Sequence, residues 1–178
     1  MKRALMCAGV LMAAAFSLSA QQNPPASPPE TSTGTVSGKT VTITYNSPRV
    51  KGREGHIFTQ DGLIKTSRGS QYPIWRAGAN AATTLKTEGD LKIGDVPVPA
   101  GTYTLFVDIS DPDQWTLIVS KKTGEWGLAY DPSQDLGRTK MKMSKPSTMV
   151  EDLVWKIGGG TINLAWENHA ASVSVSAK

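Results

Sequence analysis

The sequence has one cysteine, Cys7, and two histidines, and both scarcities limit its chemistry. Cys7 lies in an N-terminal segment that we expect to be removed, so the remaining chain can form no disulfide, thiolate nucleophile or cysteine metal site. G-x-S-x-G and H-E-x-x-H motifs are absent, and "SGKT" at residues 37–40 lacks the first glycine of a phosphate-binding loop, because position 33 is Thr33. The common hydrolase, zinc-peptidase and nucleotide-binding signatures are therefore missing.

A strong excess of one charge is also lacking. The 19 basic and 15 acidic residues give a formal net charge of +4. Lys2 and Arg3 fall in the segment to be removed, which leaves 17 basic against 15 acidic side chains, a net charge of +2. Because no dense Lys/Arg cluster accompanies this small excess, we expect neither nucleic acid nor an anionic membrane as a partner.

One long apolar run is present, at the N-terminus. Lys2 and Arg3 precede the apolar stretch Ala4–Leu18, and small residues follow up to Ala20. This order predicts a signal peptide over residues 1–20 and an exported protein, periplasmic or extracellular. The run is short for a spanning helix, which needs about 20 apolar residues, so we expect no membrane span after cleavage.

The next segment, "QQNPPASPPETSTGT" at residues 21–35, has no large hydrophobic side chain. A segment of this composition buries too little surface to order itself, so we expect a disordered Pro/Ser/Thr-rich spacer. The remaining residues, 36–178, are enough for a single domain.

No stretch of the chain sustains a helical apolar period over three turns. Short segments with alternating apolar and polar positions are instead separated by turns rich in Gly, Pro and Asp. Thr102–Ile109 and Trp115–Ser120 carry apolar residues on both faces, which is typical of the centre of a sandwich. About nine such strands predict an all-β fold, an antiparallel β-sandwich of jelly-roll or immunoglobulin-like type with long irregular loops.

Six stretches carry a resemblance that covers nearly all of this domain in order. They are "SPRVKGR" (47–53), "IWRAGANAATT" (74–84), "IGDVPVPAGTYTLF" (93–106), "WTLIVSK" (115–121), "EWGLAYDPSQDLGR" (125–138) and "LAWENHAASVSV" (164–175). Together they resemble the exported bacterial family catalogued as domain of unknown function 2911 (DUF2911). The resemblance implies export and an all-β fold, and it brings no activity with it. The chain departs from the family in its less regular link over residues 57–75, which bears on the entrance of any site, and at Asp95, where a second turn glycine is usual.

A polar and aromatic set in the irregular segments predicts a binding site. Arginine offers a planar fork for carboxylate, phosphate or diol groups, and Trp and Tyr offer flat faces for a sugar ring. We therefore expect a non-catalytic module that binds a polar small molecule or glycan of the cell envelope, without a cofactor. The candidate residues are Arg49, Trp75, Arg76, Asn80, Trp126, Tyr130, Asp131 and Arg138. The alternative is structural: Arg76 or Arg138 paired with Asp131, and Asn80 in a turn, would tie the loops to the core.

Three further alternatives remain open at the level of sequence. A hydrolase or isomerase would use paired carboxylates with an imidazole as acid and base, from Asp131, Asp135, Glu167 and His169. A metal site would need the two Glu-x-His pairs to meet, Glu54 with His56 and Glu167 with His169. A purely structural or protein-interaction module, recognised through an exposed sheet edge, is the third class. The sequence gives no oligomeric state.

Overall fold

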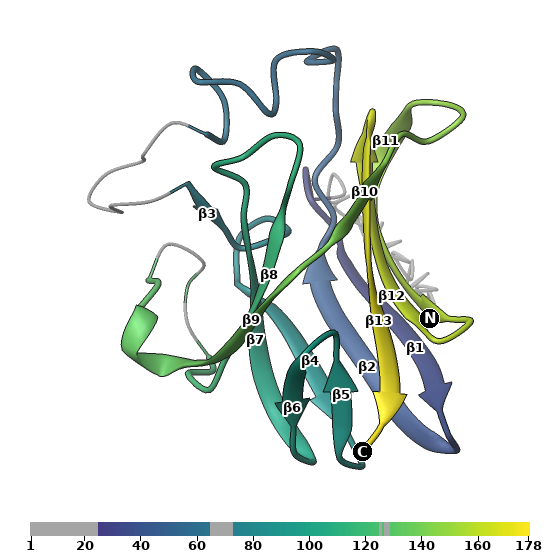
Figure 1. Cartoon of the computed structure of the whole chain (residues 1–178). Helices are drawn as coiled ribbons and strands as arrows, with labels where there is room; N and C mark the ends of the chain where they lie inside the picture. Colours follow the sequence, from purple (N-terminus) through teal and green to yellow (C-terminus); the bar gives the residue numbers. More distant parts are fainter. Residues whose placement is uncertain (1–24, 65–72, 125, 127–128) are drawn as a thin grey trace, which may run out of the picture.

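The protein is a sandwich of two antiparallel β-sheets (Figure 1). The computed structural model describes residues 25–64, 73–124, 126 and 129–178. These residues form 13 strands and one short 3-10 helix, η1 (Pro132–Gln134). The predicted all-β sandwich is confirmed. The expected number of about nine strands is too low, because residues 29–35 were expected to be disordered and the strand at residues 74–75 is too short to leave an alternating pattern.

The first sheet has seven strands in the order β1-β2-β4-β7-β8-β9, and β3 also pairs with β7. Its strands are β1 (Pro29–Val36), β2 (Lys39–Asn46), β3 (Ile74–Trp75), β4 (Thr83–Thr87), β7 (Gly101–Asp108), β8 (Thr116–Ser120) and β9 (Asp135–Lys140). β7 and β8 lie inside this sheet, as their two apolar faces predict.

The second sheet has six strands in the order β11-β12-β13-β5-β6, and β10 also pairs with β13. Its strands are β5 (Leu91–Ile93), β6 (Val96–Val98), β10 (Lys142–Ser144), β11 (Val150–Gly158), β12 (Thr161–Glu167) and β13 (His169–Ala177). The chain passes from the first sheet to the second at Met141, which is 1% exposed between β9 and β10.

Strand β1 corrects the expected boundary of the N-terminal spacer. Residues 29–36 pair along their whole length with β2, from Pro29 opposite Asn46 to Val36 opposite Lys39. An edge strand needs backbone partners and few buried side chains. All seven residues of β1 that precede Val36 are polar, proline or glycine. The composition that predicted disorder is therefore compatible with a strand, and the folded domain begins before residue 36.

Both long sides of the sandwich are closed by contacts between edge strands. β1 packs beside β11, where a Cβ on Gly34 would lie 2.8 Å from Cγ2 of Ile157. β6 packs beside β9, where a Cβ on Gly137 would lie 2.8 Å from Cγ1 of Val96. The loops at the two ends are consequently the places where the interior can be reached.

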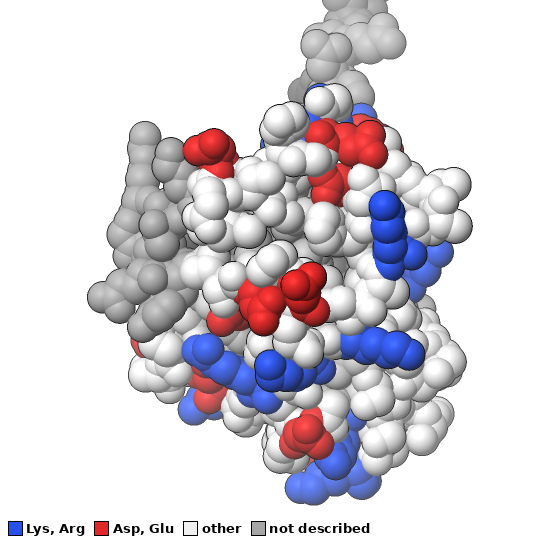
Figure 2. Space-filling view, turned by 45° about the horizontal axis from the view of Figure 1, so that its top comes forward, with Lys and Arg blue, Asp and Glu red and all other residues white. Residues whose placement is uncertain are grey.

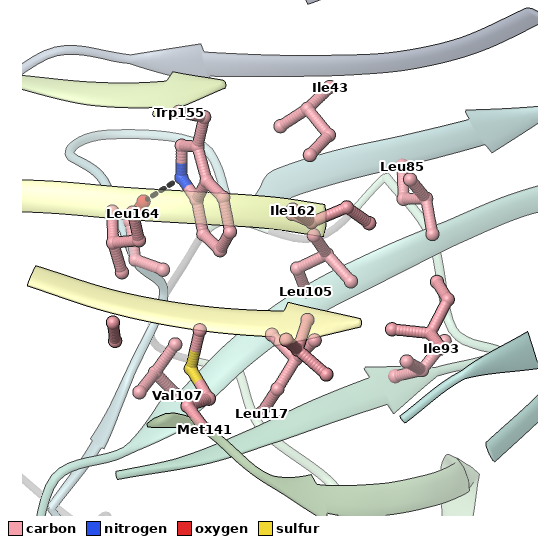
Figure 3. Packing of buried hydrophobic residues seen from close by; sticks show 14 of the residues in the cluster. Ile43, Leu85, Ile93, Leu105, Val107, Leu117, Met141, Trp155, Ile162 and Leu164 are labelled. Carbon is pink, nitrogen blue, oxygen red and sulfur yellow. Dashed lines mark hydrogen bonds between the residues drawn. The ribbon is translucent and has the colours of Figure 1, made fainter. Parts of the chain in front are cut away.

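A single large core fills the space between the sheets. Figure 3 shows side chains from both layers pointing toward one another, with Leu105 and Leu117 on one side and Trp155 and Ile162 on the other. Each of these four side chains is at most 1% exposed. Burial of one such side chain stabilises a protein by about 1.5–3 kcal/mol, so the core fixes the strands that hold the end loops.

Candidate functional site

The turn over residues 76–82 leaves the first sheet between β3 and β4 and is held by hydrogen bonds to both sheets. The backbone N–H of Ala79 donates to the carbonyl of Asn46 at 3.0 Å, and Nε1 of Trp155 donates to the carbonyl of Ala77 at 3.0 Å. Ala77 and Asn80 have positive φ angles of 52° and 57°. Non-glycine residues enter this region only when the surroundings enforce it, so the turn has one imposed shape.

Trp75 points into the sandwich and is 5% exposed. Its Nε1 donates to the carbonyl of Gly78 at 3.2 Å, and its ring stacks on Trp166 with centroids 5.8 Å apart and an interplanar angle of 20°. Phe58 contacts Trp75, Trp115, Trp166 and His169, with ring centroids 4.5 to 5.8 Å away. Trp75 is therefore part of an aromatic wall, and most of its ring is covered by neighbouring side chains.

The segment that carries Phe58, residues 48–64, lies across the end of the sandwich where β12 and β13 meet. The backbone N–H of Gly55 donates to Oε1 of Glu167 at 2.6 Å, and Nδ2 of Asn168 donates to Oε1 of Glu54 at 2.8 Å. The two Glu-x-His segments, 54–56 and 167–169, thus lie side by side.

Two adjoining pockets open between this segment, Trp166 and the turn 76–82. The larger, about 590 Å³, is lined by Arg53, His56, Ile57, Thr59, Asp61, Gly62, Leu63 and Trp166. The smaller, about 250 Å³, is lined by Ser27, Pro48, Arg53, Leu63, Trp75, Arg76, Gly78, Ala79 and Trp166. Because Arg53, Leu63 and Trp166 border both, we call the two pockets together the end groove. Its combination of apolar walls with a few polar groups is typical of small-molecule sites.

Of the predicted site residues, Trp75 and Arg76 border the end groove. Arg76 is partly buried, its Nη1 donates to the carbonyl of Asn80 at 2.7 Å, and burial lowers the pKa of its guanidinium. Asn80 therefore acts through its backbone oxygen. Arg49 lies outside the groove, in an ion pair of 2.8 Å with Asp152.

The remaining predicted residues belong to the opposite, outer face of the first sheet. Trp126 is 64% exposed and its backbone bridges to Ala81, so the two loops do meet. Tyr130 packs on Phe106 with centroids 5.1 Å apart, in a small cluster on the outer side of β7 and β8. Trp75 and Tyr130 consequently lie on different faces of one sheet, and the eight predicted residues do not form a single site.

On that outer face, Tyr130, Asp135 and Arg138 form a network. The Tyr130 hydroxyl donates to Oδ2 of Asp135 at 2.9 Å and accepts a bond from Nη2 of Arg138, while Nε of Arg138 donates to Asp135 at 2.7 Å. Burial, followed by the hydrogen bond to Asp135, raises the pKa of Tyr130. Asp131 instead caps η1 by accepting from Ser133, which lowers its pKa. The prediction that Arg138 pairs with Asp131 is thus wrong, and Arg138 pairs with Asp135 instead.

Glu167 and His169 form a close pair at the groove end. Oε2 of Glu167 lies 2.9 Å from Nδ1 of His169, and the Glu167 side chain is 1% exposed. Glu167 also has a positive φ of 56°. His56 borders the larger pocket, but among the described residues no three His, Cys, Asp or Glu side chains are grouped to hold a metal ion.

Four residues in or beside the end groove were not singled out as site residues from the sequence: Arg53, Phe58, Leu63 and Trp166. Arg53 ends the stretch "SPRVKGR", so its position in a stretch that resembles the family was the only available signal.

Figure 2 shows this end of the molecule turned forward, and its charged side chains form small groups of both signs separated by uncharged surface. A broad surface for a polyanion is not present on this face.

The family comparison covers both sheets and the end groove. A family model described as "Protein of unknown function (DUF2911)" matches residues 27–175. No curated protein and no solved structure matches the chain. Within the described ranges, no helix has the length and apolar character needed to cross a membrane.

Proposed function

The chain belongs to the DUF2911 family, and we propose that it is an exported, non-catalytic protein that binds a polar ligand in the end groove. The leader-like residues 1–20 support export. The observation that carries the proposal is that two loops and a strand end, far apart in sequence, converge there on Arg53, Arg76 and Trp166.

The composition of the groove favours a ligand with hydroxyl or acidic groups. Thr59, Asp61 and His56 bring hydrogen-bonding groups to the larger pocket, while Ile57 and Leu63 provide apolar walls. A glycan or another cell-envelope component carries both kinds of surface. The rigid turn 76–82 and the aromatic wall hold this arrangement before any ligand arrives, which reduces the entropy lost on binding.

A thermal-shift screen of the chain from Gln21 onward tests this function. Sugars, envelope fragments and acidic metabolites form the panel, since a ligand that binds only the folded state raises the melting temperature. Ala79→Trp should fill the smaller pocket, while Ala81→Trp adds the same ring to the exposed outer side of the same turn. We expect ligands that stabilise the wild type and Ala81→Trp but not Ala79→Trp. A panel without any such ligand rejects the function.

A second candidate function is general-base catalysis by Glu167 and His169, and their 2.9 Å contact favours it. A buried carboxylate on Nδ1 orients the imidazole and leaves Nε2 to take a proton from water or a substrate hydroxyl. Asp131 and Asp135 take no part, because both are engaged on the outer face.

The two histidines give this second candidate a matched control. Hydrolysis of an activated ester should fall in His169→Gln and Glu167→Gln and persist in His56→Gln, with a pH profile that follows one ionisation. Equal rates in all three variants, or a rate no higher than buffer, reject catalysis by the pair.

A further inference from the structure

We infer that the ligand of the end groove is an acidic sugar unit, with its carboxylate or phosphate between Arg53 and Arg76 and its ring in the larger pocket. This inference rests on the proposed function of the same groove. It adds the sign of the ligand's charge, the residues that read that charge, and the place of the uncharged part.

The pairing of the arginines carries the first step. Arg49 and Arg138 each have a carboxylate partner, Asp152 at 2.8 Å and Asp135 at 2.7 Å. Arg53 and Arg76 have none among the described residues, although every acidic residue of the chain except Glu125 is described. Of the four arginines that the structure describes, the two without a carboxylate partner are also the two that border the same pocket of about 250 Å³.

The partners that Arg53 and Arg76 do have are neutral: both donate to backbone carbonyls, and Cζ of Arg53 also lies over the ring of Trp166, 6.0 Å from its centroid. Nε and Nη2 of Arg53 donate to Val50 and Arg49 at 3.0 and 2.6 Å, and Nη1 of Arg76 donates to Asn80 at 2.7 Å. These bonds fix both side chains in position and leave N–H groups without a partner in the described part of the chain. They supply no negative charge.

The electrostatic consequence is a small pocket with two positive groups and no compensating anion. Burial disfavours the charged form of Arg76, and no neighbouring carboxylate offsets that effect on its pKa. A ligand oxyanion would supply the missing charge and accept charge-assisted hydrogen bonds from both guanidinium groups. A neutral ligand would leave the unfavourable charge in place.

The larger pocket determines what is attached to the anion. It shares Arg53, Leu63 and Trp166 with the smaller pocket, so one ligand can extend through both. Thr59, Asp61 and His56 provide acceptors and donors for hydroxyl groups. Its volume of about 590 Å³ lies within the range of about 300–1,000 Å³ seen for small-molecule sites. A polyhydroxylated ring with one acidic group fits both parts.

Isothermal titration with five probes tests the inference. D-glucuronate and glucose 6-phosphate carry the ring with either oxyanion, glucose carries the ring alone, and acetate and inorganic phosphate carry the anion alone. We expect binding of at least one of the acidic sugars, with an affinity that falls as ionic strength rises. Glucose, acetate and inorganic phosphate should each bind about tenfold or more weakly than that sugar, which corresponds to about 1.4 kcal/mol.

Arginine variants connect the binding to the two side chains. Arg76→Gln and Arg53→Gln should weaken the acidic sugar about tenfold or more, and Arg49→Gln should leave its affinity within about twofold. Arg53 also holds the backbone at residues 49 and 50, so Arg53→Gln can fail to fold. In that case the affinity of Arg76→Gln for the acidic sugar alone decides the test.

The outcomes separate the inference from the proposed function. If glucose binds as tightly as the acidic sugars, or if Arg76→Gln keeps full affinity for the acidic sugar, the inferred anionic group of the ligand is rejected. The groove then remains a binding site. Acetate or phosphate bound as tightly as the acidic sugars rejects the sugar ring. No binding of these probes, when the thermal-shift panel yields a different groove ligand, rejects the acidic sugar alone. No ligand in either experiment rejects both.

Discussion

Nε1 of Trp155 donates a 3.0 Å hydrogen bond to the carbonyl oxygen of Ala77, and this contact joins the core to the turn that carries Arg76 (Figure 3). The same oxygen accepts a bond from Oγ1 of Thr83 at 3.0 Å. A side chain that is 1% exposed thereby controls a turn at the rim of the end groove.

Trp155→Phe should lower the free energy of unfolding by about 1–3 kcal/mol, because the buried carbonyl loses a donor and the smaller ring leaves space. Affinity for any groove ligand should fall with it. Denaturant unfolding measures the first effect. Trp126→Phe is the control, and its 64% exposed ring should change stability by less than about 0.5 kcal/mol. Equal stability of the two variants would contradict this role of Trp155.

Alanine substitutions at Gly94 and Gly38 should both lower stability, but by different amounts. Both have positive φ, 56° and 78°, so either alanine should cost about 1–2 kcal/mol for its backbone conformation. A Cβ at Gly94 would also lie 2.1 Å from Oγ1 of Thr139, whereas a Cβ at Gly38 has nothing within 4 Å. Gly94→Ala should therefore be the less stable variant, by about 1–3 kcal/mol. Urea midpoints of the two proteins test this order.

Tyr130 predicts a loss of stability in alkali. Burial and the hydrogen bond to Asp135 raise its pKa in the folded protein above the unfolded value of about 10. The stability that Tyr130 contributes through this raised pKa is fully present below a pH of about 10. It is lost as the pH rises toward the folded pKa, because in that range the Tyr130 hydroxyl ionises only in the unfolded chain. Urea midpoints measured across this range should fall less steeply for Tyr130→Phe. An unchanged slope would mean that Tyr130 ionises normally.

The position of β1 predicts where the folded domain begins. A chain that starts at Pro25 should be as stable as one that starts at Gln21. A chain that starts at Ser37 should lose at least about 2 kcal/mol, because it lacks Val36, which is 6% exposed, and leaves the edges of β2 and β11 uncovered. Thermal unfolding of the three chains provides the test, and equal melting temperatures would restore the spacer interpretation.

The alternating pattern of the central strands was sufficient to predict the sandwich and its interior. The hairpin over Leu91–Val98 is also visible in the sequence, because Gly94 marks its turn. β1 was missed because an exposed edge strand buries almost no side chains and so leaves no hydrophobic pattern.

The predicted site residues come together only in part, for two physical reasons. Trp75 lies in the two-residue strand β3, which is too short to leave an alternating pattern, and Tyr130 lies in an irregular segment, where side chains do not alternate with period two. Arg53 and Arg76 border the same pocket although they come from different segments of the chain, and no local sequence pattern encodes that arrangement. Arg76 was singled out because its chemistry suits ligand binding, and in the structure it borders the smaller pocket.

The two ends of the described chain lie at opposite ends of the sandwich, and this decides how the protein can be attached to a surface (Figure 1). Ser27 borders the smaller pocket, whereas the C-terminal strand finishes beside β5 at the far end. A fusion or immobilising tag placed after Lys178 leaves the groove facing the solution. The same tag placed just before Ser27 would stand at the groove's rim and compete with the ligand for space.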